Sequence, residues 1–326
     1  MRSGSNPQKK TKKLHLTIQH RVVVVTYIPK LQGYYANSLE VLKMCLDSLI
    51  KANDNTYKIT VVNNGSCKAV FELLHSYAHQ DIDTIIHHRT NIGKIDAVIG
   101  AARGSREDYI TLSDSDILFT IGWNRATMQV FKAFKNVGSV SPIPFRHGLY
   151  YGTSSTLGKI LFRKVKYYYK PIPENYEEHN KYLTSINWNN EKDNNINWPF
   201  IESNSVKAIV GSGHQVLTLK RGILFETVPF NPSLTLVGGD SEYRYIDEPI
   251  DKAGLMRLGT YNNYAYHMGN EVEEWMYEKL ENEIGLNADY NYGDSLFNFR
   301  KTNENDSKVY KLKKYLLKKA FKIFYR

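Results

Sequence analysis

The stretch "YITLSDSDILF", residues 109–119, brings a run of apolar and β-branched residues directly up to two aspartates. A short run of this kind predicts a buried strand. Asp114 and Asp116 are two residues apart, and in an extended chain residues i and i+2 lie on the same side. Two carboxylates side by side suit Mg²⁺ or Mn²⁺, and these ions in turn bind phosphate oxygens. The stretch therefore predicts a metal site where a strand ends.

The Asp-x-Asp spacing is a weak signal when taken alone. The same spacing occurs at Asp81 and Asp83, where it precedes a predicted strand and indicates a solvated turn. Ligands of open parallel sheets bind outside the carboxyl ends of the strands. The position of Asp114 and Asp116 after a strand, and not the spacing, favours the metal role.

Strand and helix patterns alternate around this stretch as far as residue 119. The predicted strands are 21–28, 57–62, 83–89 and 108–113, and the predicted helices are 37–53, 70–80 and 95–105. This alternation predicts an α/β fold with a Rossmann-like, mostly parallel sheet and helices on both of its faces. Residues 148–200 are rich in Tyr, Asn and Pro, and they break the pattern. We expect long loops there.

Composition is that of a soluble globular protein. The 326 residues are 42% hydrophobic and 23% charged, and no apolar run is long enough for a transmembrane helix. The first residues lack the apolar segment of a signal peptide. Two cysteines, Cys45 and Cys67, fit a reducing compartment. These observations predict a cytoplasmic protein.

The net charge of +10 is concentrated at the two ends of the chain. Residues 1–13 contribute +5 and residues 307–326 contribute +8, so the body carries about −3. A nearly neutral body argues against a nucleic-acid groove. Basic ends favour contact with an anionic surface.

Residues 307–326 predict a basic amphipathic helix. The residues expected on its apolar face are Val309, Leu312, Leu316, Leu317, Ala320, Phe321, Ile323 and Phe324. Seven of the eight basic residues lie on the other face, with Lys313 as the exception. Such helices lie on anionic membranes. The alternatives are a helix packed on the body and a helix that binds a partner.

Six motifs in order resemble one known family. They are "VVVVTYIP" at 22–29, "VVNNGS" at 61–66, "NIGKIDAVIGAARG" at 91–104, "LSDSDI" at 112–117, "GGDSEY" at 238–243 and "YHMGN" at 266–270. Over about residues 21–270 the chain resembles a glycosyltransferase of the GT-A fold, most like the inverting, nucleotide-sugar-dependent family 2 of bacterial surface-glycan synthesis. It departs from the family at Val25, Ile28 and Asn63, where the family usually has proline, asparagine and aspartate.

The resemblance implies roles for individual residues. The donor is expected to contact Thr26, Tyr27, Asn63, Asn64, Gly93, Lys94, Asp114 and Ser115. Asp114, Asp116 and His267 are expected to hold Mn²⁺ or Mg²⁺. Asp240 is expected to be the catalytic base, and Trp123, Gly239, Ser241 and Glu242 to contact the acceptor.

Each of these roles has a plainer alternative. Asp240 opens a predicted helix, so it is also a candidate N-cap, and Glu242 competes with it as the base. His267 lies between aromatic residues and is also a candidate core residue. Lys94 fits an ordinary helix start as well as a donor contact. An amide oxygen at Asn63 can still accept the N3–H of uracil.

The expected function is inverting transfer of a hexosyl or N-acetylhexosaminyl group, from a nucleotide-sugar donor, most simply a UDP-sugar, to a glycan or lipid-linked oligosaccharide. The alternatives are a sugar nucleotidyltransferase and an inactive glycan- or membrane-binding module.

The expected location is the inner face of the cell membrane, bound through 307–326, and the oligomeric state stays open. The expected segments are a basic leader (1–20), a nucleotide-sugar half (21–120), an acceptor half (121–270), a helix and linker (271–306) and the amphipathic helix (307–326).

Overall fold

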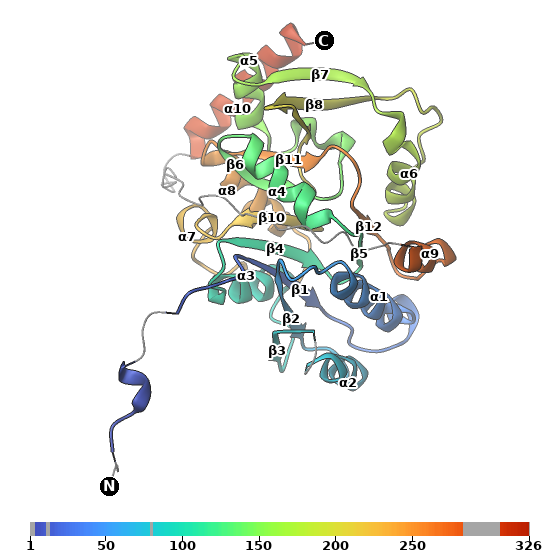
Figure 1. Ribbon diagram of the computed structural model, residues 1–326. Coiled ribbons are helices and arrows are strands. Elements are labelled where there is room, and N and C mark those ends of the chain that lie inside the picture. Colours follow the sequence, from blue (N-terminus) through green and yellow to red (C-terminus); the bar gives the residue numbers. More distant parts are fainter. Residues whose placement is uncertain (1–3, 11–13, 79–80, 283–306, 326) are drawn as a thin grey trace.

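A computed structural model describes residues 4–10, 14–78, 81–282 and 307–325 (Figure 1). In these ranges a ten-stranded mixed sheet has the order β3-β2-β1-β4-β10-β6-β11-β9-β8-β7, and a second sheet pairs β12 with β5. The strands are β1 His20–Thr26, β2 Lys58–Asn64, β3 Thr84–His88, β4 Tyr109–Asp114, β5 Ile117–Phe119, β6 Val137–Ser141, β7 Lys166–Pro171, β8 Asn197–Ser203, β9 Val206–Val210, β10 Val216–Lys220, β11 Met256–Thr260 and β12 Ala265–His267.

Helices cover both faces of the large sheet, as expected for the GT-A fold class. The α-helices are α1 Ser38–Lys51, α2 Lys68–Tyr77, α3 Lys94–Gly104, α4 Trp123–Ala133, α5 Ser154–Leu161, α6 Tyr176–Ser185, α7 Ile223–Glu226, α8 Glu248–Lys252, α9 Glu274–Asn282 and α10 Ser307–Phe324. Short 3₁₀ turns are η1 Pro7–Lys10, η2 Gly33–Tyr35, η3 Arg146–Tyr150 and η4 Pro173–Asn175, and η5 Tyr243–Asp247 is a π-helical turn. The strands and helices expected before residue 119 are confirmed in the described residues, and residues 79–80 of the helix expected at 70–80 lie outside them.

The alternating valines of β1 separate two parts of the core. Val22 and Val24 pack in the cluster that contains α1 and α2, whereas Val23 and Val25 pack in the cluster that contains α3 and α7. A strand that is buried on both faces reads as a continuous apolar run, which explains the four consecutive valines. A third cluster joins α4 and α5 to β6, β9 and β11 and includes Phe321 of α10.

Parallel pairing in one half of the sheet aligns the ends of three strands. β1 pairs in parallel with β2 and β4, and β2 pairs in parallel with β3. The register places Thr26 beside Asn63 and Val25 beside Asp114. The far half is antiparallel, except that β11 runs parallel to β6. The polar ends of β1, β2 and β4 therefore lie at one edge of the sheet.

The expectation of long loops at 148–200 is wrong. This segment contains α5, α6 and strand β7, and it leads into β8. β7 has the sequence "KYYYKP" and forms the edge of the sheet, where charged residues and proline are tolerated. The Tyr-rich composition that indicated loops belongs to a strand, because aromatic residues fit a half-buried pleated surface.

The amphipathic helix expected at the C-terminus is present as α10, and it packs on the body beside α5 (Figure 1). Tyr310 and Phe321 are buried, and the Tyr310 hydroxyl donates to an Asp251 Oδ2 at 2.7 Å. The predicted single apolar face is divided. Phe321 faces the body, whereas Val309, Leu312, Leu316 and Ile323 are exposed, between 53% and 69%. A helical wheel defines faces but not which face a neighbour covers.

No helix among the described residues is both long enough and apolar enough to cross a membrane. The linker expected before α10 falls at 283–306, outside the described residues.

Candidate active site

The carboxyl ends of β1, β2 and β4 line one cavity of about 550 Å³. The predicted site residues that line it are Tyr27, Asn64, Lys94, Asp114, Ser115 and Asp116. Tyr34, Tyr35, Leu236, Val237 and Asn270 complete much of its wall. Seven chain segments therefore supply one concave surface that combines aromatic rings, amides, one lysine and two carboxylates.

Asp116 and His267 meet in this region although 151 positions separate them in the sequence numbering. The antiparallel pair of β12 and β5 sets His267 opposite Ile117, next in sequence to Asp116. His267 Nε2 lies 3.4 Å from Asp116 Oδ2, and its Nδ1 lies 2.8 Å from the Ser185 hydroxyl oxygen. Ser185 thus orients the imidazole so that its other nitrogen points at the carboxylate.

The charge of Asp116 controls the titration of His267. Burial by itself would lower the pKa of His267, but contact with the Asp116 carboxylate outweighs burial and raises that pKa. Burial likewise opposes ionisation of Asp116, and His267 outweighs it, so the pKa of Asp116 is lowered. One oxygen of Asp116, Oδ1, is buried and has no hydrogen-bond partner. An orphaned oxygen on a carboxylate whose other oxygen faces an imidazole nitrogen fits a bound cation.

Asp114 forms an ion pair with the side chain of Lys94. Lys94 Nζ lies 2.8 Å from Asp114 Oδ1 and 2.9 Å from its Oδ2. The same ammonium lies 3.4 Å from Glu242 Oε1. Burial lowers the pKa of Lys94, but the two carboxylates outweigh this and raise it. Lys94 is therefore a charged link between the end of β4 and the helix that follows the Gly-Gly turn.

The three expected metal ligands do not all converge. Asp116 and His267 are in contact, whereas Asp114 turns its carboxylate to Lys94. Burial and the neighbouring charge of Asp116 raise the pKa of Asp114 despite Lys94. Asp114 and Asp116 are thus two partly buried carboxylates in one place, and only Asp114 is paired with Lys94, an arrangement that a divalent cation would stabilise further.

The two asparagines at the end of β2 differ in their surroundings. Asn63 Oδ1 accepts the Ser66 N–H at 2.9 Å, and Asn63 Nδ2 lies 3.1 Å from His87 Nδ1. Asn64, by contrast, lines the cavity and donates to Asn91 Oδ1 at 2.9 Å. Asn63 is held within the turn, and Asn64 and Asn91 present amides at the cavity wall.

A loop near Leu236 is fastened over the start of α3. The Lys94 N–H donates to the Leu236 carbonyl at 2.9 Å, and Asp96 Oδ1 accepts the Ser233 N–H at 2.7 Å. Gly93 has φ of 99°, and a Cβ there would collide with the Thr235 carbonyl oxygen. The glycine of the Asn-x-Gly-Lys segment is required by this close approach.

The predicted base and acceptor residues lie in different environments. Asp240 is exposed and has φ of 59°, directly after Gly238 and Gly239, which also have positive φ. Ser241 is buried and donates to Glu242 Oε2 at 3.0 Å. Asp240 therefore faces solvent at the turn, while Glu242 faces the carboxylate cluster.

Trp123 has a packing role in this structure. It is fully buried, and its ring packs against His20, Tyr57 and Phe119. A side chain without exposed surface offers no direct contact to an acceptor. The predicted acceptor contact of Trp123 is therefore corrected to core packing at the start of α4. Thr26 is also buried, with an unpartnered hydroxyl.

Two contributors from α6 were missed from the sequence. Ser185 orients His267, and the Tyr182 hydroxyl accepts from Gln215 Nε2 at 2.9 Å. No local pattern could have found them, because α6 lies in the segment that was expected to be loops. Asn91, by contrast, belongs to the Asn-x-Gly-Lys segment at residues 91–94, and this motif could have identified it as a site residue.

Comparison with known proteins supports the resemblance. The family model described as Glycosyl transferase family 2 matches residues 34–187, which confirms the resemblance over that range. Among curated proteins, none matches.

Solved structures with similar folds include three glycosyltransferases. The mannosyltransferase PcManGT of Pyrobaculum calidifontis, in complex with GDP-Man and Mn²⁺, is 14% identical, with 74% of this chain and 54% of that chain covered and a TM-score of 0.42. TarS of S. aureus (1–349) is 11% identical, with 77% and 60% covered and a TM-score of 0.44. GalNAc-T7 with UDP, GalNAc and Mn²⁺ is 14% identical, with 77% and 44% covered and a TM-score of 0.47. The chain thus spans 44% to 60% of the lengths of these three. Similarity this low does not assign their substrates to this chain.

Proposed function

We propose that the protein is a metal-dependent glycosyltransferase. Residues 34–187 match the family model Glycosyl transferase family 2, which supports this proposal. The protein transfers a hexosyl or N-acetylhexosaminyl group from a nucleotide-sugar donor, in the first instance a UDP-sugar, to a glycan hydroxyl. The observation that carries the proposal is the cavity at the ends of β1, β2 and β4, into which Lys94, Asp114 and Asp116 converge.

In this proposal the nucleotide occupies the cavity and the sugar lies toward β12. Tyr27 and Tyr34 are 37% and 70% exposed and offer rings to the base, and Asn64 offers an amide. Asn63 is a less direct candidate for contact with the base, because its amide oxygen already accepts a hydrogen bond from the Ser66 N–H. Gly93 and Ser115 bring backbone close to the donor.

Asp116 and His267, with Asp114, would hold Mn²⁺ or Mg²⁺. A bound divalent ion would offset the charge that develops on the leaving diphosphate. Lys94 holds Asp114 in place and adds positive charge to the same wall. The buried Oδ1 of Asp116, which has no hydrogen-bond partner, is the feature that best fits such an ion.

Asp240 is the proposed general base for the acceptor hydroxyl, with Gly239 and Ser241 beside it. The proposed reaction inverts the anomeric configuration. The acceptor oxygen attacks the anomeric carbon from the face opposite the diphosphate, whose bond to that carbon breaks, and Asp240 takes the hydroxyl proton. Glu242 is the competing candidate, since it lies nearer to Lys94 and Asp114. The acceptor class in this proposal is a surface polysaccharide, lipopolysaccharide or capsule precursor on a lipid.

The test of donor class is a thermal-shift series on the full chain with UDP, GDP, CMP and Mn²⁺. We expect one nucleoside diphosphate to stabilise the protein only when Mn²⁺ is present. Ligand at 100 times its Kd contributes about 2.7 kcal/mol. Slow release of free sugar from the matching nucleotide-sugar would exclude an inactive module. A response to nucleoside triphosphate plus sugar phosphate, with release of pyrophosphate, would instead identify a nucleotidyltransferase.

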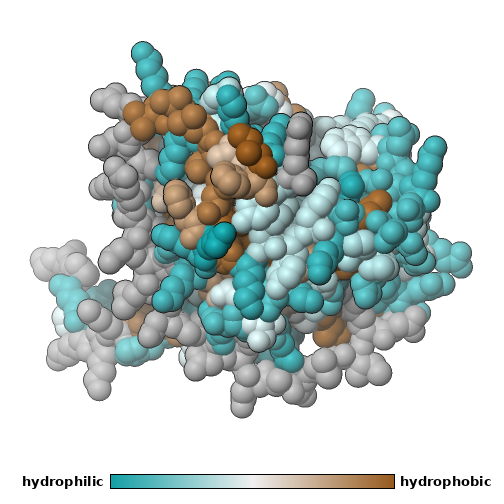
Figure 2. Space-filling model, turned by 90° about the horizontal axis from the view of Figure 1, so that it is seen from above, coloured by the Kyte–Doolittle hydropathy of each residue, from teal (hydrophilic) through white to brown (hydrophobic). Residues whose placement is uncertain are grey.

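We also propose that the outer face of α10 binds an anionic membrane. Hydrophobic side chains gather beside hydrophilic ones on the side of the molecule where α10 lies (Figure 2). Lys308, Lys311 and Lys319 are exposed on this helix, which contains no acidic residue. Burial together with the charges of Lys164 and Lys313 lowers the pKa of Lys159 on α5. Basic groups are thus crowded here, and an anionic surface would relieve their repulsion.

Truncation is a poor test, because α10 also covers buried side chains. A double substitution of exposed residues, Leu312→Ser with Leu316→Ser, removes apolar surface and leaves Tyr310 and Phe321 in place. We expect it to weaken co-sedimentation with anionic vesicles by about tenfold or more. Wild-type binding should also weaken with salt, as the Debye length falls from about 10 Å at 0.1 M to about 3 Å at 1 M.

Phe230→Ser is the matched control, because Phe230 is 80% exposed and lies outside both basic ends of the chain. It should bind vesicles as the wild type does. Equal binding by the double variant and the wild type, or no binding at low salt by either, would rule out the membrane role of α10.

A further inference from the structure

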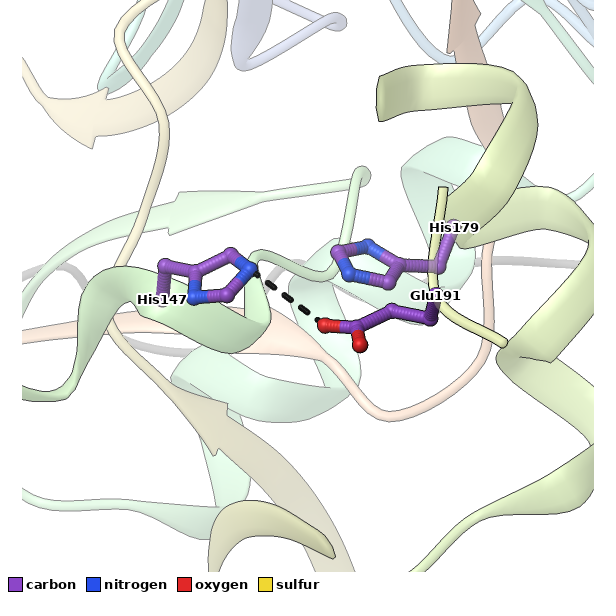
Figure 3. Close-up of side chains that lie close together, drawn as sticks. All are labelled: His147, His179 and Glu191. Carbon is purple, nitrogen blue, oxygen red and sulfur yellow. Dashed lines mark ion pairs between the residues drawn. The ribbon is translucent and has the colours of Figure 1, made fainter. Parts of the chain in front are cut away.

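A second cluster of metal-binding side chains lies outside the proposed donor site. His147 of η3, His179 of α6 and Glu191 of the segment after α6 point toward one another (Figure 3). One ligand atom from each lies within 4.8 Å of the other two, and His147 Nε2 lies 3.8 Å from Glu191 Oε1. Three segments that are apart in the sequence thus bring two imidazoles and one carboxylate to one point.

His179 supplies an independent observation. Its side chain is 97% buried, and neither ring nitrogen has a hydrogen-bond partner. Buried polar groups in folded proteins almost always have partners, because an unpaired one loses its solvation without compensation. Its ring lies 5.0 Å from the Trp198 ring and 5.7 Å from the His147 ring, centroid to centroid. A ligand at the cluster would supply the missing partner.

Glu191 is held in position from α6. Its backbone N–H donates to Asn180 Oδ1 at 2.8 Å, and its carbonyl accepts from the Tyr176 hydroxyl at 2.8 Å. Arg146 donates to Glu191 Oε1 at 2.7 Å and to the Asn197 carbonyl at 3.0 Å. A carboxylate has capacity for both an arginine and a further ligand, because it offers two oxygens. The arginine therefore orients Glu191 without excluding a cation.

We propose that His147, His179 and Glu191 bind a divalent transition-metal ion of the Zn²⁺ class. Two imidazole nitrogens and one carboxylate oxygen are donors that Zn²⁺ takes readily, whereas Mg²⁺ and Mn²⁺ favour oxygen. Bonds of about 2.0–2.2 Å require ligand atoms roughly 3.4 Å apart, so the cluster must close by about 1 Å. His147 can make that movement, because its side chain is 38% exposed.

The imidazoles are in the form that binds metals. Burial, with the nearby His147 and Arg146, lowers the pKa of His179 to about 3. Burial and Arg146 lower the pKa of His147 against the opposing charge of Glu191. Both rings are therefore neutral at pH 7 and offer a lone pair.

The bound ion ties α6 to η3 and thereby supports the proposed active site. α6 carries His179 at one position and Tyr182 and Ser185 one and two turns later. Ser185 orients His267, and Tyr182 contacts Gln215. This second consequence rests on the proposed function, whereas metal binding itself does not.

The experiment uses the full chain, stripped with a chelator and titrated with Zn²⁺ by calorimetry and with Co²⁺ by visible absorption. We expect one ion per chain in the wild type, with the intense visible bands of low-coordinate Co²⁺, and a higher melting temperature with Zn²⁺. Glu191→Gln and His147→Gln should each weaken Zn²⁺ binding by about 100-fold or more, because loss of a second-shell partner alone costs 10–100-fold. Circular dichroism of the metal-free variants checks their folding.

Two further variants separate this site from others. Asp116→Asn should retain the Zn²⁺ site, which distinguishes it from the proposed nucleotide-metal site. His75→Gln alters another close histidine pair, in which His75 and His87 stack at 6.1 Å, and it should bind Zn²⁺ as the wild type does. Failure of the wild type to bind Zn²⁺, or undiminished binding by both Glu191→Gln and His147→Gln, would overturn the proposal. If Asp116→Asn alone abolished binding, the ion would belong to the donor site.

Discussion

Asp116→Asn is expected to reduce glycosyl transfer by about 10³-fold and to abolish the Mn²⁺-dependent stabilisation by nucleotide. A divalent cation contributes several kcal/mol at a developing diphosphate, and each 1.36 kcal/mol is a factor of ten in rate. The substitution keeps the shape of the side chain but removes the charge that faces His267 at 3.4 Å. Steady-state transfer and thermal shifts with and without Mn²⁺ measure the two effects.

The matched control is Asp81→Asn, in the other Asp-x-Asp of the chain. Asp81 is exposed in a turn before β3, and this variant should behave as the wild type. A full Mn²⁺-dependent shift in Asp116→Asn would place the metal elsewhere.

The pH dependence of metal binding follows from His267. Because Asp116 raises the pKa of His267, their charged pair stabilises the fold fully below the ordinary histidine pKa, about 6.5. That contribution is lost as pH rises through the raised pKa of the folded state. A cation needs the neutral imidazole, so stabilisation by Mn²⁺ and nucleotide should grow over the same rise in pH. Asp116→Asn should lack this growth.

Asp240→Asn is expected to lower transfer by 10²–10⁴-fold, the usual contribution of general base catalysis, while donor affinity stays within about threefold of the wild type. Asn tolerates positive φ, so the turn at φ 59° should keep its conformation. Single-turnover transfer and nucleotide titration on the same preparation separate the chemical step from binding. NMR of the product should show the anomeric configuration opposite to that of the donor.

Glu242→Gln is the matched comparison, since it removes the competing carboxylate. Burial raises the pKa of Glu242, but Lys94 outweighs burial and lowers it, which makes Glu242 a weaker base than an ordinary glutamate. We expect this variant to impair donor binding, because it disturbs the link from Lys94 to Asp114. If Asp240→Asn transferred sugar at the wild-type rate, and Glu242→Gln lost turnover without losing donor binding, Glu242 would be the general base. Retention in the product would exclude the inverting mechanism.

Much of the first 120 residues is readable from local sequence. The four valines before Thr26 predict a strand, because a short β-branched run is typical of one. The structure adds that neighbouring valines of this strand face different helix layers. The spacing of apolar residues along 37–53 predicts α1 in the same way. Asp114 and Asp116 follow the strand that ends at the cavity, so their position at a strand end was also available. Such features depend on backbone periodicity and on residues close in sequence.

Other features depend on which distant segments meet. His267 reaches Asp116 only because β12 pairs with β5, and Ser185 reaches His267 only because α6 packs against that pair. Trp123 matched a family pattern, yet packing buried it beside His20 and Tyr57. Residues 148–200 were misread because edge strands and short helices of aromatic and polar residues lack a clear period.

The sequence by itself determined the order of the elements in the first half, the strand that ends in two carboxylates, and a C-terminal helix with basic and apolar sides. Each of these is a local property, set by the alternation of side chains along a strand or around a helix. Tertiary structure alone decided the pairing of Asp116 with His267, the meeting of His147, His179 and Glu191, and the apolar residues of α10 that stay exposed. The physical reason is that these contacts join residues from 12 to 151 positions apart. Strand register and the covering of one helix face by another bring such residues together, and no period in the local sequence encodes either.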